Sequence, residues 1–364
     1  MKVIVGISGG VDSAVTAMLL KQQGHEVEAL FMKNWKEQSE TGECSWQAEV
    51  EDALKVCEKL SIPLNTIDLS SEYWESVFKL FLQDYSNGLT PNPDVLCNQE
   101  IKFRAFMEQA LKFGADKIAT GHYARITDTA GSFQLLKGTD FNKDQSYFLC
   151  RLTQYQLSKS LFPVGNLDKI AVRNLAAAAG LPVYAKKDST GICFIGERPF
   201  REFLSQYLPV RKGPIETIEG NQVGEHDGVC FYTIGQRQGL GIGGVRGSVD
   251  APWYVVDKNT EKNVLYVVQT ADHPLLFRRG LTAKNLHWIA GTPPELLFNC
   301  YAKTRYRQPD QSCIIESINS DTATVIFAKP QKAVTPGQYV VFYQDQVCLG
   351  GGVIDSTWNC SQTV

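Results

Sequence analysis

The amino-acid sequence predicts an α/β protein: a Rossmann-like domain with a parallel sheet, followed by two smaller β-rich domains, the last a β-barrel. Up to about residue 200, short apolar runs alternate with helical patterns. Near residue 205 the pattern changes to β-rich runs punctuated by glycine and proline, and from about residue 276 several runs alternate apolar and polar residues. We therefore expect domains at 1–204, 205–275 and 276–364.

The first region combines short apolar strands with longer amphipathic helices. The predicted strands are 3–7, 27–32, 64–68 and 117–120. The predicted helices are 13–23, 46–59, 71–85, 99–113 and 167–179, the last followed by a capping glycine and a proline. This alternation indicates a parallel sheet covered on both faces, with ligands bound at the carboxyl ends of its strands.

The other two regions are predicted to consist mainly of strands. Those of the middle region are 229–234, 253–257 and 264–268. Those of the last region are 281–289, 297–304, 313–318, 322–327, 339–344 and 347–354. The segment 239–244 satisfies G-x-G-x-x-G, but no helical pattern follows it, so we expect a glycine hinge or a substrate-facing loop rather than a dinucleotide site.

Composition narrows the class of protein. No apolar run approaches the roughly 18 residues that span a bilayer, and Met1 leads directly into an apolar strand, so we expect no membrane partner, no signal peptide and a cytoplasmic location. The net charge of −3 argues against bulk attraction to nucleic acid. A local basic face is still expected, because residues 276–364 hold eight Lys and Arg against six Asp and Glu.

The ten cysteines include no C-x-x-C pair, so the sequence offers no local nucleus for a zinc or iron–sulfur centre and predicts no metal-ligand cluster. Most of them should be small buried hydrophobes, as Cys57 and Cys150 in their apolar surroundings illustrate. The cysteines in polar, loop-like surroundings are therefore the candidates for chemistry.

A glycine- and hydroxyl-rich turn follows the first apolar strand. Its residues are Gly6, Ile7, Ser8, Gly9, Gly10, Val11, Asp12 and Ser13. Uncrowded backbone N–H groups at a helix N-terminus bind phosphate, and Asp12 could hold a metal ion or order the loop. The Walker A lysine is missing, and the segment instead resembles the PP-loop of ATP pyrophosphatases, which cleave ATP between the α and β phosphates. An ordinary glycine-rich turn is the alternative.

Two cysteines have suitable chemical neighbours. Cys97 is predicted to lie just before a helix, where the helix N-terminus and Lys102 favour its thiolate, and Asp94 is close enough to serve as acid or base. Cys193 lies between Gly191 and a second glycine, with several cations nearby, in a segment suited to carrying sulfane sulfur. The alternative is that both cysteines are incidental.

Taken together, these motifs resemble those of the bacterial tRNA-specific 2-thiouridylases, the MnmA/TrmU family, over essentially the full length. The matching stretches are the PP-loop, 92–94 with Cys97-Asn98, 121–125, 143–147, 191–196, 232–237 and 303–307. Such an ordered set of motifs is more specific than any one of them.

The resemblance implies roles for individual residues. ATP would be bound by the loop from Gly6 to Ser13 together with Met32 and Gly121. The target base would meet Asn92, Pro93 and Asp94, and tRNA would contact Lys143, Asp144, Gln145, Arg305 and Tyr306. Cys193 would carry the persulfide, with Cys97 as the second catalytic cysteine. Without the resemblance, Met32 could be core, His122 a structural histidine, and 305–307 a solvated strand face.

The resemblance further implies ATP-dependent 2-thiolation of the wobble uridine in tRNA. The uracil C2 oxygen would be adenylated, with Mg²⁺ as the expected metal ion, releasing pyrophosphate, and sulfur from Cys193 would then give 2-thiouridine and AMP. The partners implied are the tRNAs for Lys, Glu and Gln, a persulfide donor (a cysteine desulfurase or a sulfur-relay protein) and a reductant. Two other functions stay open: a PP-loop ligase or amidotransferase acting on a small metabolite, and a non-catalytic RNA-binding protein.

Overall fold

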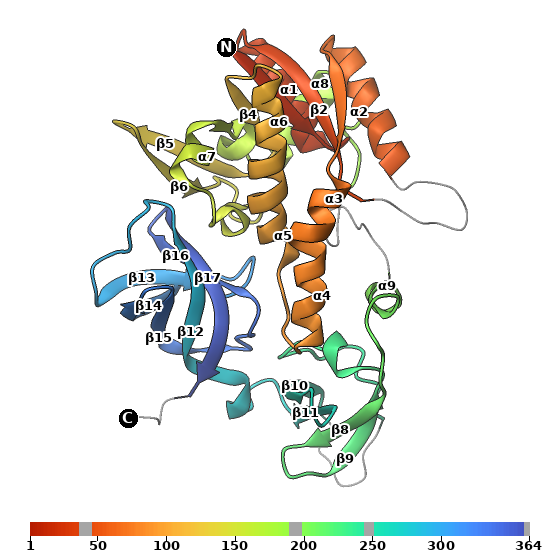
Figure 1. Cartoon of the computed structure of the whole chain (residues 1–364), viewed down its shortest axis with the longest axis vertical. Helices are drawn as coiled ribbons and strands as arrows, with labels where there is room; N and C mark the ends of the chain where they lie inside the picture. Colours follow the sequence, from red (N-terminus) through yellow and green to blue (C-terminus); the bar gives the residue numbers. More distant parts are fainter. Residues whose placement is uncertain (36–45, 189–198, 244–250, 360–364) are drawn as a thin grey trace.

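A five-stranded parallel sheet forms the centre of the first region in the computed structural model, which describes residues 1–35, 46–188, 199–243 and 251–359 (Figure 1). The strand order is β3-β2-β1-β4-β7. The bounds are β1 Lys2–Ile7, β2 Glu26–Lys33, β3 Leu64–Asp68, β4 Lys117–Ala119 and β7 Ser160–Leu161. The predicted parallel sheet is confirmed.

Helices cover both faces of this sheet, because alternate side chains of each strand point to opposite sides. On one face, Val3 and Val5 of β1 pack with α1, α2 and α8, which span Val11–Gln22, Trp46–Leu60 and Lys169–Ala178. On the other face, Ile4 lies in the core with Ile101 and Phe106 of the helical segment 93–112. Both faces of the sheet are therefore buried.

Two long helical segments contain π-helical stretches. The first consists of α3 Ser70–Tyr73, a π-helical part Trp74–Phe78 and α4 Lys79–Ser86. The second consists of α5 Pro93–Leu96, a π-helical part Cys97–Phe106 and α6 Met107–Lys112. The predicted start of this second helix at residue 99 is wrong: it begins at Pro93, whose fixed φ and missing N–H suit the first helical position.

The middle region forms a four-stranded sheet in the order β10-β11-β8-β9, approached through α9 Phe200–Ser205. Its strands are β8 Gly213–Thr217, β9 Gln222–His226, β10 Trp253–Asn259 and β11 Val264–Gln269. The predicted strand 229–234 is wrong, because Val229–Phe231 is a 3-10 turn. The pair β8–β9 was missed because Gly213, Pro214 and Gly220 resemble loop punctuation. Residues 239–243 are not helical.

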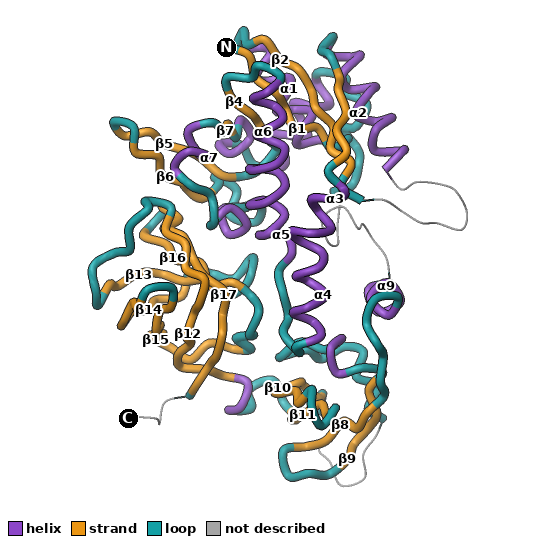
Figure 2. The backbone as a smooth tube through the Cα atoms, in the orientation of Figure 1, coloured by secondary structure: helices purple, strands orange, loops and turns teal. Residues whose placement is uncertain are grey.

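The last region is a closed antiparallel barrel in the order β12-β15-β14-β13-β16-β17, with β17 also pairing with β12. Its strands are β12 Phe277–Trp288, β13 Phe298–Lys303, β14 Gln311–Asn319, β15 Thr322–Lys332, β16 Tyr339–Gln344 and β17 Val347–Trp358. Figure 2 shows helices gathered around the first sheet, while this part is almost entirely strands and loops. The predicted β-barrel is confirmed.

A hairpin from the first region extends the barrel sheet. It consists of β5 Ala124–Thr129 and β6 Ser132–Lys137, and Leu136 and Leu135 of β6 pair with Val347 and Cys348 of β17. The sequence prediction missed this hairpin, since its apolar runs are short and its partner strand lies far along the chain. The first region and the barrel therefore share one sheet.

Three of the remaining helical elements lie between β6 and α8: 3-10 turns at Ser146–Leu149 and Pro163–Asn166 and the helix α7 Gln154–Ser158. A further 3-10 turn, Pro274–Leu276, lies between β11 and β12. In the described part of the chain, no helix is both long and apolar enough to cross a membrane.

Candidate active site

The glycine-rich loop lies where β1 ends and α1 begins, at the carboxyl edge of the parallel sheet. The Ser13 hydroxyl accepts a hydrogen bond from the Ser8 N–H at 3.2 Å and donates one to the Gly10 carbonyl at 3.1 Å, which closes the turn on itself. Gly10 is the N-cap and supplies no side-chain cap. The first N–H groups of α1 are therefore suited to an anion.

Two glycines let this loop pack closely against its neighbours. Gly9 has a φ of +68°, and a Cβ there would lie 2.4 Å from the Glu49 carbonyl oxygen of α2. A Cβ on Gly121 would lie 2.8 Å from both Asp12 C and Ser13 N. Gly121, predicted from the sequence as part of the ATP site, therefore touches the first turn of α1 directly.

Met32 lies on β2 beside the strand that leads into the loop. A Cβ on Gly6 would lie 3.6 Å from Met32 Cε and 3.3 Å from Phe106 Cζ. Met32 is also part of the hydrophobic core, with 9% of its surface exposed. Met32 is therefore both a core residue and a neighbour of the glycine-rich loop.

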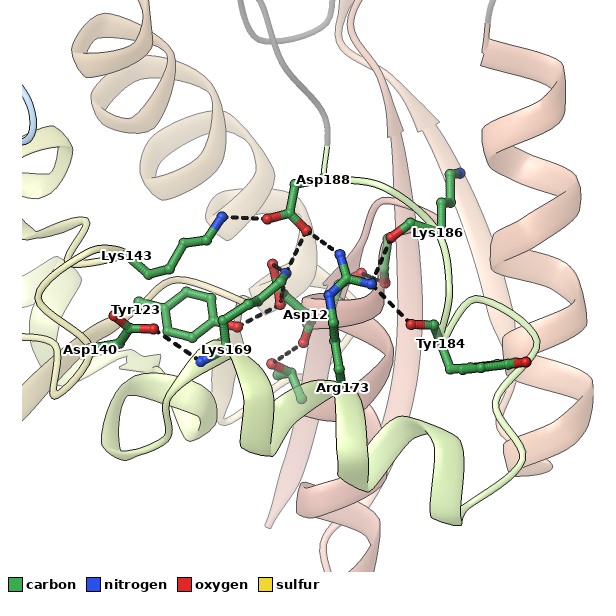
Figure 3. A network of polar contacts seen from close by, with 12 residues as sticks. Asp12, Tyr123, Asp140, Lys143, Lys169, Arg173, Tyr184, Lys186 and Asp188 are labelled. Atoms are coloured by element: carbon green, nitrogen blue, oxygen red, sulfur yellow. Dashed lines mark hydrogen bonds and ion pairs between the residues drawn. The ribbon is translucent and has the colours of Figure 1, made fainter.

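Asp12 is the centre of a polar network that sequence reasoning did not anticipate (Figure 3). Its Oδ1 accepts a hydrogen bond from the Tyr123 hydroxyl at 2.7 Å. Lys169 Nζ lies 2.7 Å from Oδ1 and 2.8 Å from Oδ2. Burial, followed by the charge of Asp12, raises the pKa of Tyr123, so the phenol stays protonated and donates. The carboxylate is thus held by two donors from distant parts of the chain.

Asp188 collects three cations in the same network. Lys143, Lys169 and Arg173 all contact its carboxylate, Lys169 at 2.8 Å and Arg173 at 2.9 Å. Burial alone would raise the pKa of Asp188, but the hydrogen bonds from Lys143 and Lys169 lower it to about 2. Lys169 therefore bridges the carboxylates of Asp12 and Asp188.

A fourth cation supports the loop from its carbonyl side. Lys186 Nζ donates to the Gly9 carbonyl at 3.1 Å and to the Asp52 carboxylate at 2.7 Å. Since Asp52 belongs to α2, this lysine ties the glycine turn to the neighbouring helix. Its contact orders the backbone of the loop.

The predicted base-recognition motif forms the first turn of the helical segment 93–112. Asn92 is the N-cap, Pro93 and Asp94 begin α5, and Asp94 is half-buried. Cys97 is not before the helix, as predicted from the sequence, but within it, where its N–H bonds to the Pro93 carbonyl and its side chain is buried. The favourable helix-terminus effect expected for its thiolate is correspondingly weaker, because it fades within the first turn.

The next residue connects this helix to the turn 146–149. Asn98 is 3% exposed, and its Nδ2 donates to the Phe148 carbonyl at 3.2 Å. Arg151 Nε donates to Gln99 Oε1 at 2.5 Å beside it. The predicted catalytic helix therefore packs directly on the segment that follows the predicted tRNA-contact motif at Lys143.

The two predicted tRNA-contact motifs meet in the structure. Lys303 Nζ lies 3.4 Å from Asp144 Oδ2, and the side chains are 12% and 3% exposed. The rings of Tyr306 and Phe148 have centroids 4.5 Å apart. The segment 304–307 is a bend and turn after β13, not the strand face considered from the sequence.

Several of these predicted contact residues hold internal bonds. Asp144 accepts the N–H groups of Gly138 and Ser146, at 3.0 and 3.1 Å. Gln145 Oε1 accepts the Tyr123 N–H at 2.9 Å. Arg305 donates to two backbone carbonyls, at 2.6 and 2.9 Å, from the exposed surface of the barrel. Asp144 and Gln145 are thus held by internal bonds, Lys143 is paired with Asp188, and Arg305 lies at the exposed surface.

His122 has a structural environment. It is 8% exposed, lies between the rings of Phe103 and Phe162, and its Nδ1 is 2.7 Å from the Thr120 hydroxyl. Burial, followed by the charge of Lys102, lowers the pKa of His122 well below its usual value. The imidazole is neutral and packed, in agreement with the structural reading.

The cysteines divide as follows. Cys193 lies outside the described residues. Cys57 and Cys150 are buried as predicted, and burial raises the pKa of their thiols to about 11 and about 12. Among the residues that the structure describes, no group of three or more His, Cys, Asp or Glu could hold a metal ion.

Sequence reasoning assigned no role to Lys169, Arg173 or Asp188, and mentioned Tyr123 only within a motif. Lys169 is 157 residues from Asp12, and such a separation leaves no local pattern. The one available signal was its place at the start of a predicted helix after Asp168, whose carboxylate caps that helix through the Ala171 N–H.

Comparison with known proteins agrees with this architecture. The model of the tRNA methyl transferase HUP domain matches residues 1–197, that of the tRNA methyl transferase PRC-barrel domain 201–269, and that of the aminomethyltransferase beta-barrel domain 278–354. The fold and the loop thus define a nucleotide-binding protein of the PP-loop superfamily that carries two accessory β domains.

Individual relatives are more specific. The chain is 58% identical to the tRNA-specific 2-thiouridylase MnmA of Methylococcus capsulatus, covering 98% of this chain and 97% of that protein. It is 59% identical to the protein of that name from Nitrosomonas europaea, covering 97% and 98%. The chain belongs to the MnmA family of tRNA-specific 2-thiouridylases. Among solved structures, the U34-tRNA thiolase NcsA from Methanococcus maripaludis matches weakly, with 20% identity, coverage of 57% and 64%, and a TM-score of 0.35.

Proposed function

We propose that the protein is a tRNA sulfurtransferase that 2-thiolates the wobble uridine of tRNA at the expense of ATP. The observation that carries this proposal is the full-length similarity to MnmA 2-thiouridylases, combined with a glycine-rich loop whose first-turn N–H groups face the carboxyl edge of the sheet. ATP would bind through residues 6–13, Met32 and Gly121. A small-metabolite PP-loop ligase would have such a loop but would need neither the cysteine pair nor a basic β domain, and an RNA-binding protein without activity would not need the loop. Neither alternative accounts for the full-length similarity to 2-thiouridylases.

The first step activates a poor electrophile. The uracil C2 oxygen attacks the α-phosphorus of ATP, forming a C2–O–AMP ester and releasing pyrophosphate. The N–H groups of the loop stabilise the charge on the departing pyrophosphate. Asp12 is a carboxylate of the kind that Mg²⁺ takes alongside phosphate oxygens, and Mg²⁺ would supply charge neutralisation there. The base must leave its stack before it can react, and Asn92, Pro93 and Asp94 would receive it.

The second step delivers sulfur. The terminal sulfur of a Cys193 persulfide reaches C2 and AMP leaves with the former C2 oxygen, either by direct attack or as sulfide released by Cys97. Cys97 and Cys193 then end as a disulfide, and a thiol reductant restores both. Asp94 would move the proton. The persulfide would come from a cysteine desulfurase or a relay protein, and the acceptors would be the tRNAs for Lys, Glu and Gln.

The barrel would hold the tRNA together with the first region. Arg305 would provide positive charge and its neighbour Tyr306 a ring, a combination suited to phosphate and base contacts. Lys143, Asp144 and Gln145 would contact the tRNA from the first region. Binding should weaken as salt rises.

The decisive experiment is reconstitution. The purified protein is incubated with ATP, Mg²⁺, unmodified tRNA transcript and a persulfide donor, and the nucleosides are analysed by mass spectrometry. We expect 2-thiouridine at the wobble position and one AMP and one pyrophosphate per sulfur. Formation of neither adenylate nor thiouridine would refute the proposal.

A further inference from the structure

The glycine-rich loop lacks a positive charge of its own. Residues 6–13 contain no Lys or Arg, and the position that holds lysine in a Walker A loop is Asp12. A departing pyrophosphate carries several negative charges, which backbone N–H dipoles neutralise only in part. A cation from elsewhere in the fold would complete such a site.

Lys169 is placed to be that cation. It is the first residue of α8, and its ammonium lies within 2.8 Å of both Asp12 oxygens, at the first turn of α1 (Figure 3). It also contacts Asp188 at 2.8 Å, and its side chain is 12% exposed. The charge is therefore held beside the N–H groups that would bind phosphate, balanced by two carboxylates.

The neighbouring cations are arranged differently. Arg173 contacts Asp188, while its Nη1 is held by the Tyr184 and Lys186 carbonyls, both at 3.0 Å. Lys186 faces the carbonyl side of the loop. Among the described cations of this network, Lys169 is the one that contacts Asp12, the acidic side chain of the loop.

We propose that Lys169 binds the pyrophosphate part of ATP and neutralises it as it leaves, supplying from α8 the charge that a Walker A lysine supplies from within its loop. This rests on the proposed use of ATP. Phosphate oxygens of the bound ligand would replace the carboxylates as partners of the ammonium. Charge-assisted hydrogen bonds of this kind typically correspond to about 10- to 100-fold in affinity.

The test compares two ligands of the full-length protein, inorganic pyrophosphate and AMP, by calorimetry. We expect Lys169→Met to weaken pyrophosphate binding about 10- to 100-fold and AMP binding by less than about twofold, with Lys169→Arg in between. Arg173→Met is the matched control, because it also removes a cation from Asp188 without touching Asp12. It should leave the ratio of pyrophosphate affinity to AMP affinity unchanged. Equal losses for both ligands in Lys169→Met, or none, would overturn the proposal.

A second measurement needs no variant. Acetic anhydride labelling of wild-type protein, read by peptide mass spectrometry, should be slowed at Lys169 by pyrophosphate but not by AMP. Unchanged labelling contradicts the proposal even if Lys169→Met fails to fold. If wild-type protein binds ATP and pyrophosphate, but neither the Lys169 variants nor the labelling at Lys169 shows the expected effect, the role of Lys169 is refuted and the proposed function stands. If wild-type protein binds neither ligand, the proposed function itself is refuted.

Discussion

Tyr306 packs against Phe148 with ring centroids 4.5 Å apart, and this contact joins the turn after β13 to the turn after Lys143. Lys303 and Asp144 make the ionic contact beside it. Two motifs that are 160 positions apart in the sequence, 143–147 and 303–307, thus form one surface. We propose that the tRNA contacts the barrel and the first region at this surface.

The ring of Tyr306 should matter for tRNA binding. We expect Tyr306→Ala to weaken tRNA binding several-fold, since it removes both a stacking ring and the partner of Phe148, whereas Tyr306→Phe should bind within about twofold of wild type. Filter binding at two salt concentrations measures the effect. ATP binding serves as the internal control, and a loss of ATP affinity of similar size would point to general damage instead.

Gly121 should tolerate no side chain. In Gly121→Ala the new methyl group would lie 2.8 Å from the backbone at Asp12 and Ser13, so the first turn of α1 must shift. We expect ATP affinity to fall by at least tenfold, measured by calorimetry. Gly243→Ala is the matched control, because a Cβ there has no neighbour within 4 Å. Similar ATP binding by both variants would disprove this description of the loop.

The two cysteines should act after adenylation. We expect Cys97→Ser and Cys193→Ser each to abolish thiolation, while release of pyrophosphate in the presence of tRNA survives. Mass spectrometry of nucleosides and a pyrophosphate assay on the same samples separate the two steps. A variant that thiolates at the wild-type rate would remove its cysteine from the mechanism.

Lys258 of β10 should make the free energy of unfolding depend on pH in the alkaline range. Its ammonium donates to the Tyr232 carbonyl at 2.8 Å, and burial lowers its pKa from 10.5 to about 8. Between those values the unfolded chain binds more protons than the folded one, so this lysine opposes folding fully below pH 8, and the opposition fades as the pH rises to 10.5. The total change is about 3 kcal/mol.

Denaturant unfolding of wild type and Lys258→Met at several pH values isolates this contribution, because all other groups cancel in the difference. We expect the stability of wild type to rise relative to that of Lys258→Met between pH 8 and 10.5. A difference that stays constant over that range would show that the lysine titrates normally.

The sheet and the loop could be predicted because their signals are local. Apolar runs such as 3–7 and the glycines of 6–13 specify a strand and a turn within a few residues. The barrel strands followed from their alternation in the same way. The predicted start of the helical segment 93–112 was wrong although Pro93 marks it, because the polar residues around Asn98 resemble a loop.

The parts that could not be predicted depend on distant partners. The network of Asp12, Lys169 and Asp188 and the joining of β6 to β17 arise only when the chain is folded. For the same reason the domain boundaries 204 and 275 stay predictions, since a hairpin of the first region lies within the sheet of the last.

That shared sheet limits how the protein can be divided. Without β17, the backbone of β6 would lose its neighbour, and Lys137, 4% exposed and ion-paired with Asp310, would lose the partner that keeps its charge satisfied. If the first region were separated from the barrel, β6 would expose unpaired backbone N–H and C=O groups, and such a strand edge is prone to self-association. Module swapping between relatives should therefore succeed only when the hairpin travels with the barrel.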